Sequence, residues 1–232
     1  MALVKFGGGV TDMRGSIGGT VYSRNKSGAI ARARTTPINP KTALQSAIRA
    51  ILAFVSQLWR TGTTAAQKAA WAVFAANVPA KNKLGEVISL SGFNQFVKSN
   101  TAAQNAGLPN VAAAPVVFTL PGEDPTLAVV VSAAAQTIAV TFDATRDWAD
   151  EDNAALLVYM GVPQDDSIEF FDGPWRYAGA ILGDDTTPPV TGDAVACPYP
   201  VAAGQKIFTR AKIIRADGRL SDSFRTSIIA SA

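Results

Sequence analysis

The sequence predicts an α+β protein with three parts: an extended N-terminal arm, a small helical domain and a C-terminal antiparallel β-sandwich. Three observations support this class. Seven of the 19 glycines lie within residues 1–38. Apolar residues recur with the helical period of about 3.6 from residue 40 onward, and with the strand period of about 2 beyond residue 115. Residues 1–60 carry nine basic and one acidic residue, whereas residues 115–232 carry eight basic and sixteen acidic residues.

The glycine-rich arm is predicted over residues 1–38 and contains a β-hairpin. Two β-prone segments, residues 18–24 and 29–34, flank the turn sequence Asn25 to Gly28. The alternation of the second segment places Arg32 and Arg34 on one face. So polar a hairpin buries too little apolar surface to be stable alone. We therefore expect the arm to become ordered against another surface, the alternative being a mobile tail.

The charge of the arm predicts an anionic partner. The residues that we expect to contact it are Arg14, Arg24, Lys26, Arg32 and Arg34. Three interpretations are open: the arm binds nucleic-acid phosphates, it lies over acidic neighbouring subunits, or it is solvated. The acidic C-terminal region offers complementary charge within the same protein, and this favours the second interpretation.

A helical domain is predicted over residues 39–110. Asn39 and Pro40 form a helix start, because Asn caps free amides and Pro loses no hydrogen bond at the first helical position. The helix should run to about residue 60. Its apolar stripe, which we expect to form part of a core, contains Leu44, Ile48, Ile51, Val55 and Leu58.

Two further helices follow in this domain. Thr64 and Gln67 form a capping box that starts the second helix, and Pro79 ends it. The short connection predicts an αα-hairpin. A third helix begins at Ser91 and ends at Gly107. The side chains expected to face inward are Trp71, Phe74 and Val78 on the second helix, and Phe93, Phe96, Val97 and Asn100 on the third.

Residues 115–232 are predicted to fold as a separate β-sandwich domain, after a Pro-bounded boundary at residues 106–115. Seven short strands are expected, at residues 127–132, 137–143, 154–160, 175–182, 193–197, 206–215 and 220–229. The last two join at Asp217-Gly218 and resemble the closing strands of fibronectin type III domains. The resemblance implies an immunoglobulin-like sandwich. The core Trp and corner Tyr of that family are missing unless Phe208 or Tyr199 replaces them, which leaves the topology open.

A second resemblance covers residues 13–100. The segments MRGSIGGTVYSRNKSGAIARARTTPINPKTALQ, SQLWR, TAAQKAAW and SGFNQFVKSN are similar to a family of uncharacterised proteins of tailed phages and prophages. Its shared features map onto Asn39, Pro40, Thr42, Trp59, Arg60, Ala66, Gln67, Trp71, Gly92, Asn94 and Phe96. The resemblance implies a virion structural role, with assembly in the bacterial cytoplasm. It transfers no catalytic residue.

The resemblance and the basic arm lead to a functional expectation. We expect a capsid cement or decoration protein, or a head-to-tail connecting component, whose arm staples neighbouring subunits. Its partners would be copies of itself and capsid, portal or tail proteins. The alternatives are a tail component, or a nucleic-acid-binding protein that uses the basic arm.

The sequence does not gather the residues that catalysis requires, and we expect no enzyme, no cofactor and no metal site. Histidine, the commonest general base, is absent, and Cys197 is the single cysteine. Acidic residues cluster at Asp147, Asp150, Glu151 and Asp152, and again at Asp165, Asp166 and Glu169. They lack the spacing of a calcium loop, so we expect solvated carboxylates. No apolar run is long enough for a membrane span. Residues 172–175 form a turn with an exposed Trp175, either a subunit contact or plain turn chemistry.

Overall fold

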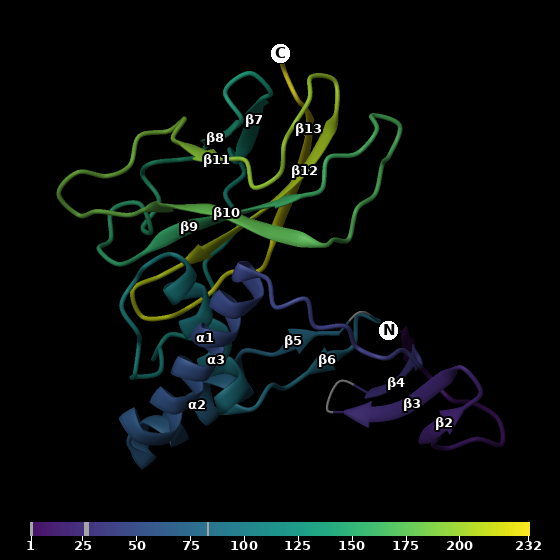
Figure 1. The fold of residues 1–232 in the computed structure, drawn as a ribbon. Coiled ribbons are helices and arrows are strands. Elements are labelled where there is room, and N and C mark those ends of the chain that lie inside the picture. Colours follow the sequence, from purple (N-terminus) through teal and green to yellow (C-terminus); the bar gives the residue numbers. More distant parts are fainter. Residues whose placement is uncertain (1, 26–27, 83) are drawn as a thin grey trace. The chain divides into compact units, whose positions relative to one another are not determined.

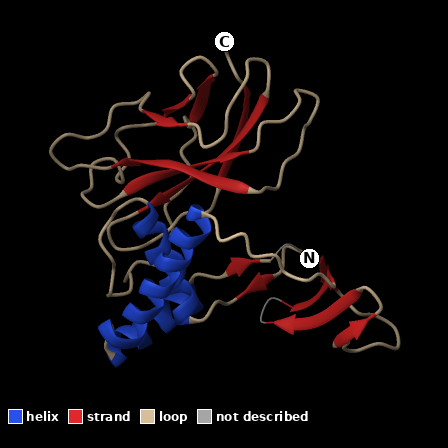
Figure 2. Cartoon of the chain, viewed as in Figure 1, coloured by secondary structure: helices blue, strands red, loops and turns tan. Residues whose placement is uncertain are grey.

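The computed structural model describes residues 2–25, 28–82 and 84–232. Over these residues the protein is mixed α and β, with three α-helices and several antiparallel sheets (Figures 1 and 2). The chain divides into two compact units, Met1–Gln95 and Phe96–Ala232. Each unit is described by itself.

The first unit begins with a four-stranded antiparallel sheet in the order β1-β4-β3-β2. The predicted hairpin is present as β3 (Thr20–Asn25) and β4 (Gly28–Ala33). Two strands that the sequence analysis did not predict, β1 (Ala2–Val4) and β2 (Gly15–Ile17), flank it. The backbone therefore pairs more fully than the polar sequence suggested.

The first helix starts later than predicted. Helix α1 spans Ala43–Gln57 and continues into a π-helical turn, η1 (Leu58–Gly62). Its N-cap is Thr42, whose hydroxyl accepts a hydrogen bond from the Gln45 amide at 3.3 Å. The prediction that Asn39 caps the helix is wrong, because Lys41 takes a left-handed conformation (φ 51°) that separates Asn39 from the helix. Asn39 instead accepts a hydrogen bond from the Arg49 side chain.

The second helix matches its prediction. Helix α2 (Ala65–Asn77) opens with the complete Thr64–Gln67 capping box and buries Trp71 and Phe74. A short two-stranded sheet follows, formed by β5 (Ala80–Lys81) and β6 (Val87–Ile88). Gly92 then lies so close to α2 that a Cβ atom would come within 2.7 Å of the Ala72 nitrogen. Only glycine permits this approach.

Helix α3 spans Gly92–Asn105, so most of it belongs to the second unit. Phe96 and Asn100 are buried as predicted, whereas Phe93 is 37% exposed and the expectation that it faces inward is wrong. Asn100 holds the chain that follows the helix: its Nδ2 donates to the Val111 carbonyl at 3.1 Å, and its Oδ1 accepts from the Val111 amide at 2.8 Å. Gly107 (φ 75°) ends the helix in the predicted way.

The rest of the second unit consists of two antiparallel sheets. The four-stranded sheet has the order β10-β9-β12-β13, and the three-stranded sheet has the order β11-β8-β7. Their strands are β7 (Ala128–Ser132), β8 (Thr137–Thr141), β9 (Ala155–Gly161), β10 (Trp175–Leu182), β11 (Ala194–Ala196), β12 (Lys206–Ile214) and β13 (Phe224–Ile229). All seven predicted strands are present. β13 starts four residues late, because Leu220 makes only an isolated bridge to Ile214.

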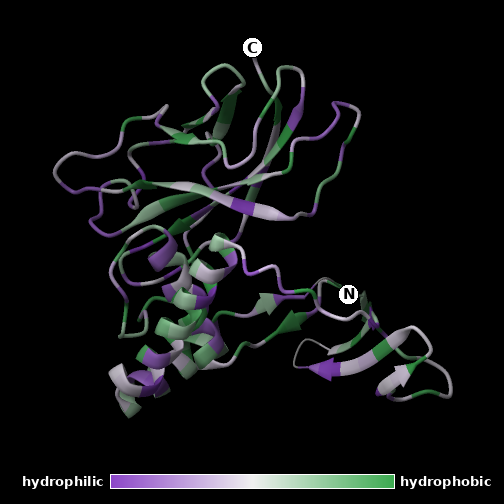
Figure 3. Cartoon of the chain, in the orientation of Figure 1, coloured by the Kyte–Doolittle hydropathy of each residue, from purple (hydrophilic) through white to green (hydrophobic). Residues whose placement is uncertain are grey.

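One hydrophobic core joins these two sheets. Val131 and Ile138 from the three-stranded sheet belong to the same buried cluster as Leu156, Met160 and Ile207 from the four-stranded sheet. Figure 3 shows hydrophobic stretches along these strands. A second cluster covers part of the outer face of the four-stranded sheet. It joins Ala102 and Ala103 of α3 to residues of β9 and β12.

Trp148, Phe208 and Tyr199 are the residues to compare with the core tryptophan and corner tyrosine of fibronectin type III domains. Trp148, between β8 and β9, is 2% exposed and packs against Phe142 with ring centroids 5.1 Å apart. Phe208 does not replace a core tryptophan, because it stacks on Phe171 rather than joining the core cluster. Tyr199 packs against the core and is partly buried.

Candidate functional site

The arginines predicted to contact a partner are placed on or beside the N-terminal sheet. Arg24 lies on β3, Arg32 lies on β4, and Arg34 follows β4 with its amide donating to the Gly19 carbonyl at 2.7 Å. Arg14 precedes β2 and forms an ion pair with Asp12 at 2.9 Å. Lys26 lies outside the described residues. Arg24, Arg32 and Arg34 are exposed, and none forms an ion pair with another described residue.

The register of the hairpin divides these arginines between two faces. Residues directly opposite one another on paired strands point to the same face. Arg32 lies opposite Val21, whereas Arg24 lies opposite Ala29. Positions 21 and 24 are an odd number of residues apart on β3, so Arg24 and Arg32 point to opposite faces. The sheet thus presents cationic side chains on both sides.

The apolar face of α1 is the second exposed feature of this unit. The predicted stripe is present as a pattern, but only Val55 on α1 is buried. Leu44 is 58% exposed and Ile48 is 48% exposed, with Leu52 and Phe54 beside them at 47% and 50%. The expectation that the stripe forms a core is therefore wrong for the first three turns of the helix.

The N-terminal sheet and α1 share this lack of buried side chains. Among the described residues between 2 and 62, only Ile30 and Val55 are buried. Ile17 and Ile38 are 64% and 90% exposed. Because burial of apolar side chains is the main force that stabilises folded chains, this region presents a surface that a partner could cover.

Three of the seven carboxylates in the acidic clusters predicted from the sequence form ion pairs with described residues. Arg215 binds Asp147 at 3.0 Å and also pairs with Glu151. In the second cluster, Lys206 binds Glu169 at 2.7 Å. Asp165 accepts hydrogen bonds from the Ser167 amide and hydroxyl, and these bonds hold the pKa of Asp165 below its ordinary value.

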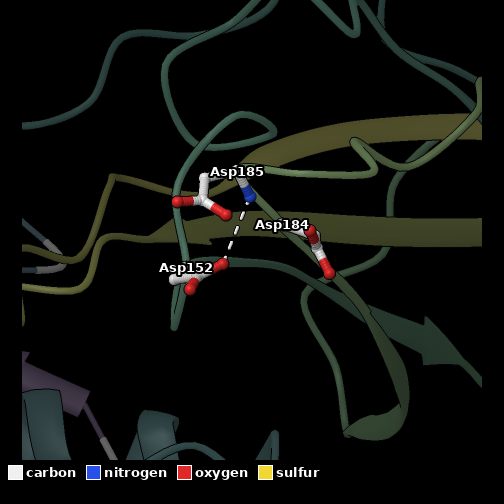
Figure 4. A group of neighbouring side chains, drawn as sticks. All are labelled: Asp152, Asp184 and Asp185. Atoms are coloured by element: carbon white, nitrogen blue, oxygen red, sulfur yellow. Dashed lines mark hydrogen bonds between the residues drawn. The ribbon is translucent and has the colours of Figure 1, made fainter.

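A different group of carboxylates comes together at Asp152, Asp184 and Asp185, whose oxygens lie within 4.8 Å of one another (Figure 4). Asp184 accepts hydrogen bonds from the Thr186 and Thr187 amides, which lower its pKa. Asp152 accepts from the Asp185 amide at 3.2 Å. These hydrogen bonds within the loops account for the arrangement without a ligand. Sequence reasoning missed the group because residues 152 and 184 are far apart in the chain.

Trp175 is half-buried, which corrects the expectation of an exposed aromatic. Its ring packs edge-on against Phe171 with centroids 5.1 Å apart, and Arg210 and Arg225 lie over it. The sequence signal for this cluster is the alternation Phe208, Arg210, Lys212 on the outer face of one strand. The contribution of Arg225 follows only from the strand register.

No family model, curated protein or solved structure matches the chain. Within the described ranges, no helix combines the length and the apolar character needed to cross a membrane.

Proposed function

We propose that this protein is a non-enzymatic structural component of a tailed-phage particle, a capsid cement or decoration protein or a head-to-tail connecting component. Residues 1–38 would form the arm that joins neighbouring subunits. The observation that carries the proposal is the contrast between regular backbone structure and minimal burial over residues 2–62, where only Ile30 and Val55 are buried among the residues described. A neighbouring subunit in an assembly would supply the missing contacts.

Charge supports a protein partner for the arm. Arg24, Arg32 and Arg34 extend from the N-terminal sheet without an ion pair in the described part of the chain. Residues 115–232 contain sixteen acidic and eight basic residues, so a second copy of the same chain offers complementary charge. The assignment to a phage particle rests on the resemblance of residues 13–100 to tailed-phage proteins.

We also propose an immunoglobulin-like sandwich of the fibronectin type III kind for residues 115–232. Lettered in chain order, β7, β8 and β11 take the places of strands A, B and E, and β9, β12 and β13 take those of C, F and G. β10 pairs with β9, as a C′ strand does, which gives sheets A-B-E and C′-C-F-G. Trp148 lies in the turn region before β9, away from the usual position of the core tryptophan in this class.

Nucleic-acid binding is the second candidate function. It is favoured by the arginines on both faces of one narrow sheet, an arrangement that could contact phosphates without reading sequence. A phosphate-binding arm would lose affinity for DNA steeply between low and moderate salt. An arm that joins protein subunits would give no such DNA binding.

Incorporation into particles tests the proposal. Particles are purified from cells that produce the chain with its virus, and copies are counted by mass spectrometry. We expect a fixed copy number for the wild type and loss of incorporation when Arg24, Arg32 and Arg34 are replaced by Glu. Replacement of Lys81, Arg176 and Arg225 by Glu makes the same charge change at exposed positions outside residues 2–62 and should preserve incorporation. Absence of the wild-type chain from particles would refute the proposal.

A further inference from the structure

The outer face of the four-stranded sheet carries a row of aromatic and guanidinium groups. The register places Tyr177 on β10 opposite Tyr159 on β9, Tyr159 opposite Arg210 on β12, and Arg210 opposite Arg225 on β13. Cross-strand neighbours lie on the same face, so these four side chains form one line across the sheet. Trp175 lies two residues before Tyr177 on β10, and Phe208 lies two residues before Arg210 on β12, so both are on this same face.

The guanidinium groups of the two arginines lie over aromatic rings. The Arg210 guanidinium lies 4.9 Å from the centroid of the Tyr159 ring and 5.2 Å from that of Trp175. Arg225 lies 5.8 Å from the Trp175 centroid. Stacking of this kind holds a guanidinium in a fixed plane and leaves its N–H edge to donate hydrogen bonds.

A cavity of about 210 Å³ adjoins this row. Its lining includes Phe170, Phe171, Trp175, Phe208 and Arg225. Gly161 shapes one wall, because a Cβ atom at this position would come within 2.4 Å of the Phe171 ring. The missing side chain lets Phe171 fold back over the sheet and stack on Phe208 at 5.5 Å. Aromatic rings thus form much of the cavity wall, and the charged residues Glu169 and Arg225 and the polar residues Thr226 and Ser227 complete it.

Among the described cations around the cavity, Arg210 is the one without an ion pair, although the charge of Asp172 acts on it from a longer distance. Lys206 pairs with Glu169 at 2.7 Å, and Arg225 pairs with Asp172 at 3.2 Å. Arg210 forms no ion pair with a described residue, and its Nε is buried without a hydrogen-bond acceptor. Burial is the main cause that lowers the pKa of Arg210. A half-buried guanidinium without an ion pair is costly, and an anionic ligand in contact with it would lower that cost.

The size and charge of the site select among anions. Beside the cavity one described cation, Arg210, lacks an ion pair, and Lys212 follows it two residues along β12, whereas two carboxylates, those of Glu169 and Asp172, already stand beside the cavity. These carboxylates would repel a polyanion such as nucleic acid more strongly than a ligand with a single negative charge. Phe208, which lines the cavity, lies two residues from Arg210 on β12, a backbone distance of about 7 Å at about 3.3 Å per residue. A ligand with one carboxylate and an apolar body of that length fits.

We propose that this face is a binding site for a carboxylate that carries an aromatic or apolar group, with the carboxylate held by Arg210 and Arg225 and the apolar group held in the cavity beside Trp175. Planar guanidinium groups bind carboxylates with paired hydrogen bonds, and such bonds to charged groups are the strong ones. The source of the carboxylate is either a small molecule or an acidic side chain of a polypeptide. The site is separate from the arm, and the proposed assembly role does not depend on it.

Titration followed by the indole N–H resonance of Trp175 in NMR spectra of the full chain tests this site. The probes are 3-phenylpropionate, its neutral amide, the acetylated dipeptide amide Phe-Glu and inorganic phosphate. We expect 3-phenylpropionate to shift the resonance. The neutral amide should bind at least about tenfold more weakly, because it lacks the charge. Tighter binding of the dipeptide than of the free acid identifies a polypeptide as the source. Tighter binding of the free acid identifies a small molecule.

Three variants assign the effect to the site. Arg210→Gln should weaken binding of 3-phenylpropionate about tenfold or more, and Arg210→Lys should weaken it less because the charge remains. Arg176→Gln is the matched control: Arg176 also stacks on a ring, that of Tyr199 at 4.2 Å, but does not line the cavity. If Arg210→Gln fails to fold, the exposed Arg225→Gln replaces it. Equal binding of acid and amide, equal or tighter binding of phosphate, or loss of binding in Arg176→Gln would overturn the proposal.

Discussion

The two four-stranded sheets of this protein have similar backbone pairing and very different interiors. In the N-terminal sheet only Ile30 is buried among the described residues, at 9% exposure. In the sheet β10-β9-β12-β13, every residue of β9 except Tyr159 is buried. Hydrogen bonds between strands contribute little net stability, since water satisfies the same groups in the unfolded chain. The second sheet is therefore stabilised by the core of its own unit, whereas we propose that the first is stabilised by contact with a neighbouring subunit.

The largest expected difference between the two regions concerns a buried and an exposed leucine. Leu156→Ala removes a side chain that is 1% exposed in the core between the sheets and should cost about 2 to 5 kcal/mol. Leu44→Ala on α1, at 58% exposure, should change stability by less than about 0.5 kcal/mol. Urea denaturation of the isolated chain measures both. A cost above about 2 kcal/mol for Leu44→Ala would mean that α1 is already packed in the monomer.

A smaller effect is expected at the glycine that admits Phe171. Gly161→Ala places a Cβ atom where the Phe171 ring lies, and such overpacking should cost about 1 to 3 kcal/mol. Gly122→Ala is the control, because a Cβ there meets no atom within 4 Å. The measurement is the free energy of unfolding of both variants. Equal values would show that the loop carrying Phe171 moves away from the added Cβ atom without loss of stability.

Lys212, on the outer face of the sheet β10-β9-β12-β13, should make the stability of the second unit depend on pH. Burial, together with the positive charges of Arg210 and Lys98, lowers the pKa of Lys212 to about 8, and the charge of Asp222 opposes this shift. Because the folded pKa lies below the unfolded value, the unfolded chain binds more protons between them. This group therefore makes stability rise as the pH increases from about 8 to about 10.5.

Lys212→Met should remove that rise and stabilise the protein at pH 7 by roughly 1 to 2 kcal/mol, since an unpaired buried charge is lost. Thermal unfolding measured at several pH values checks this. Lys206→Met, which alters a lysine paired with Glu169, should leave the rise in place. An unchanged pH dependence in Lys212→Met would contradict the assignment.

The smallest expected effect concerns the start of α1. Thr42→Ala removes the hydroxyl that caps the helix and should destabilise α1 by about 1 kcal/mol. Asn39→Ala removes only an exposed hydrogen bond to Arg49 and should cost less. Hydrogen exchange at the first turn of α1 compares the two variants. Faster exchange in Asn39→Ala than in Thr42→Ala would restore Asn39 as the cap.

Local patterns in the sequence predicted most of the elements. The capping box at Thr64, the glycine end of α3 and the seven strands follow from spacing and turn chemistry, which act over a few residues. The exposure of Leu44 and Ile48 could not be predicted, because an amphipathic pattern does not say what covers it. The position of Arg210 directly opposite Arg225 on the neighbouring strand could not be predicted either, because it depends on strand register. Strands β1 and β2 are three residues long and carry too little periodicity to be recognised.

Hydrogen exchange on the free and the assembled chain tests the central claim most directly. We predict that amides of β3 and β4 exchange rapidly in the free protein, because little apolar burial opposes their opening, while amides of β9 and β12 exchange slowly. In assembled particles the amides of β3 and β4 should become protected as well. Slow exchange of β3 and β4 in the free chain, comparable with that of β9, would contradict the account and show that the N-terminal sheet is stabilised by its own protein.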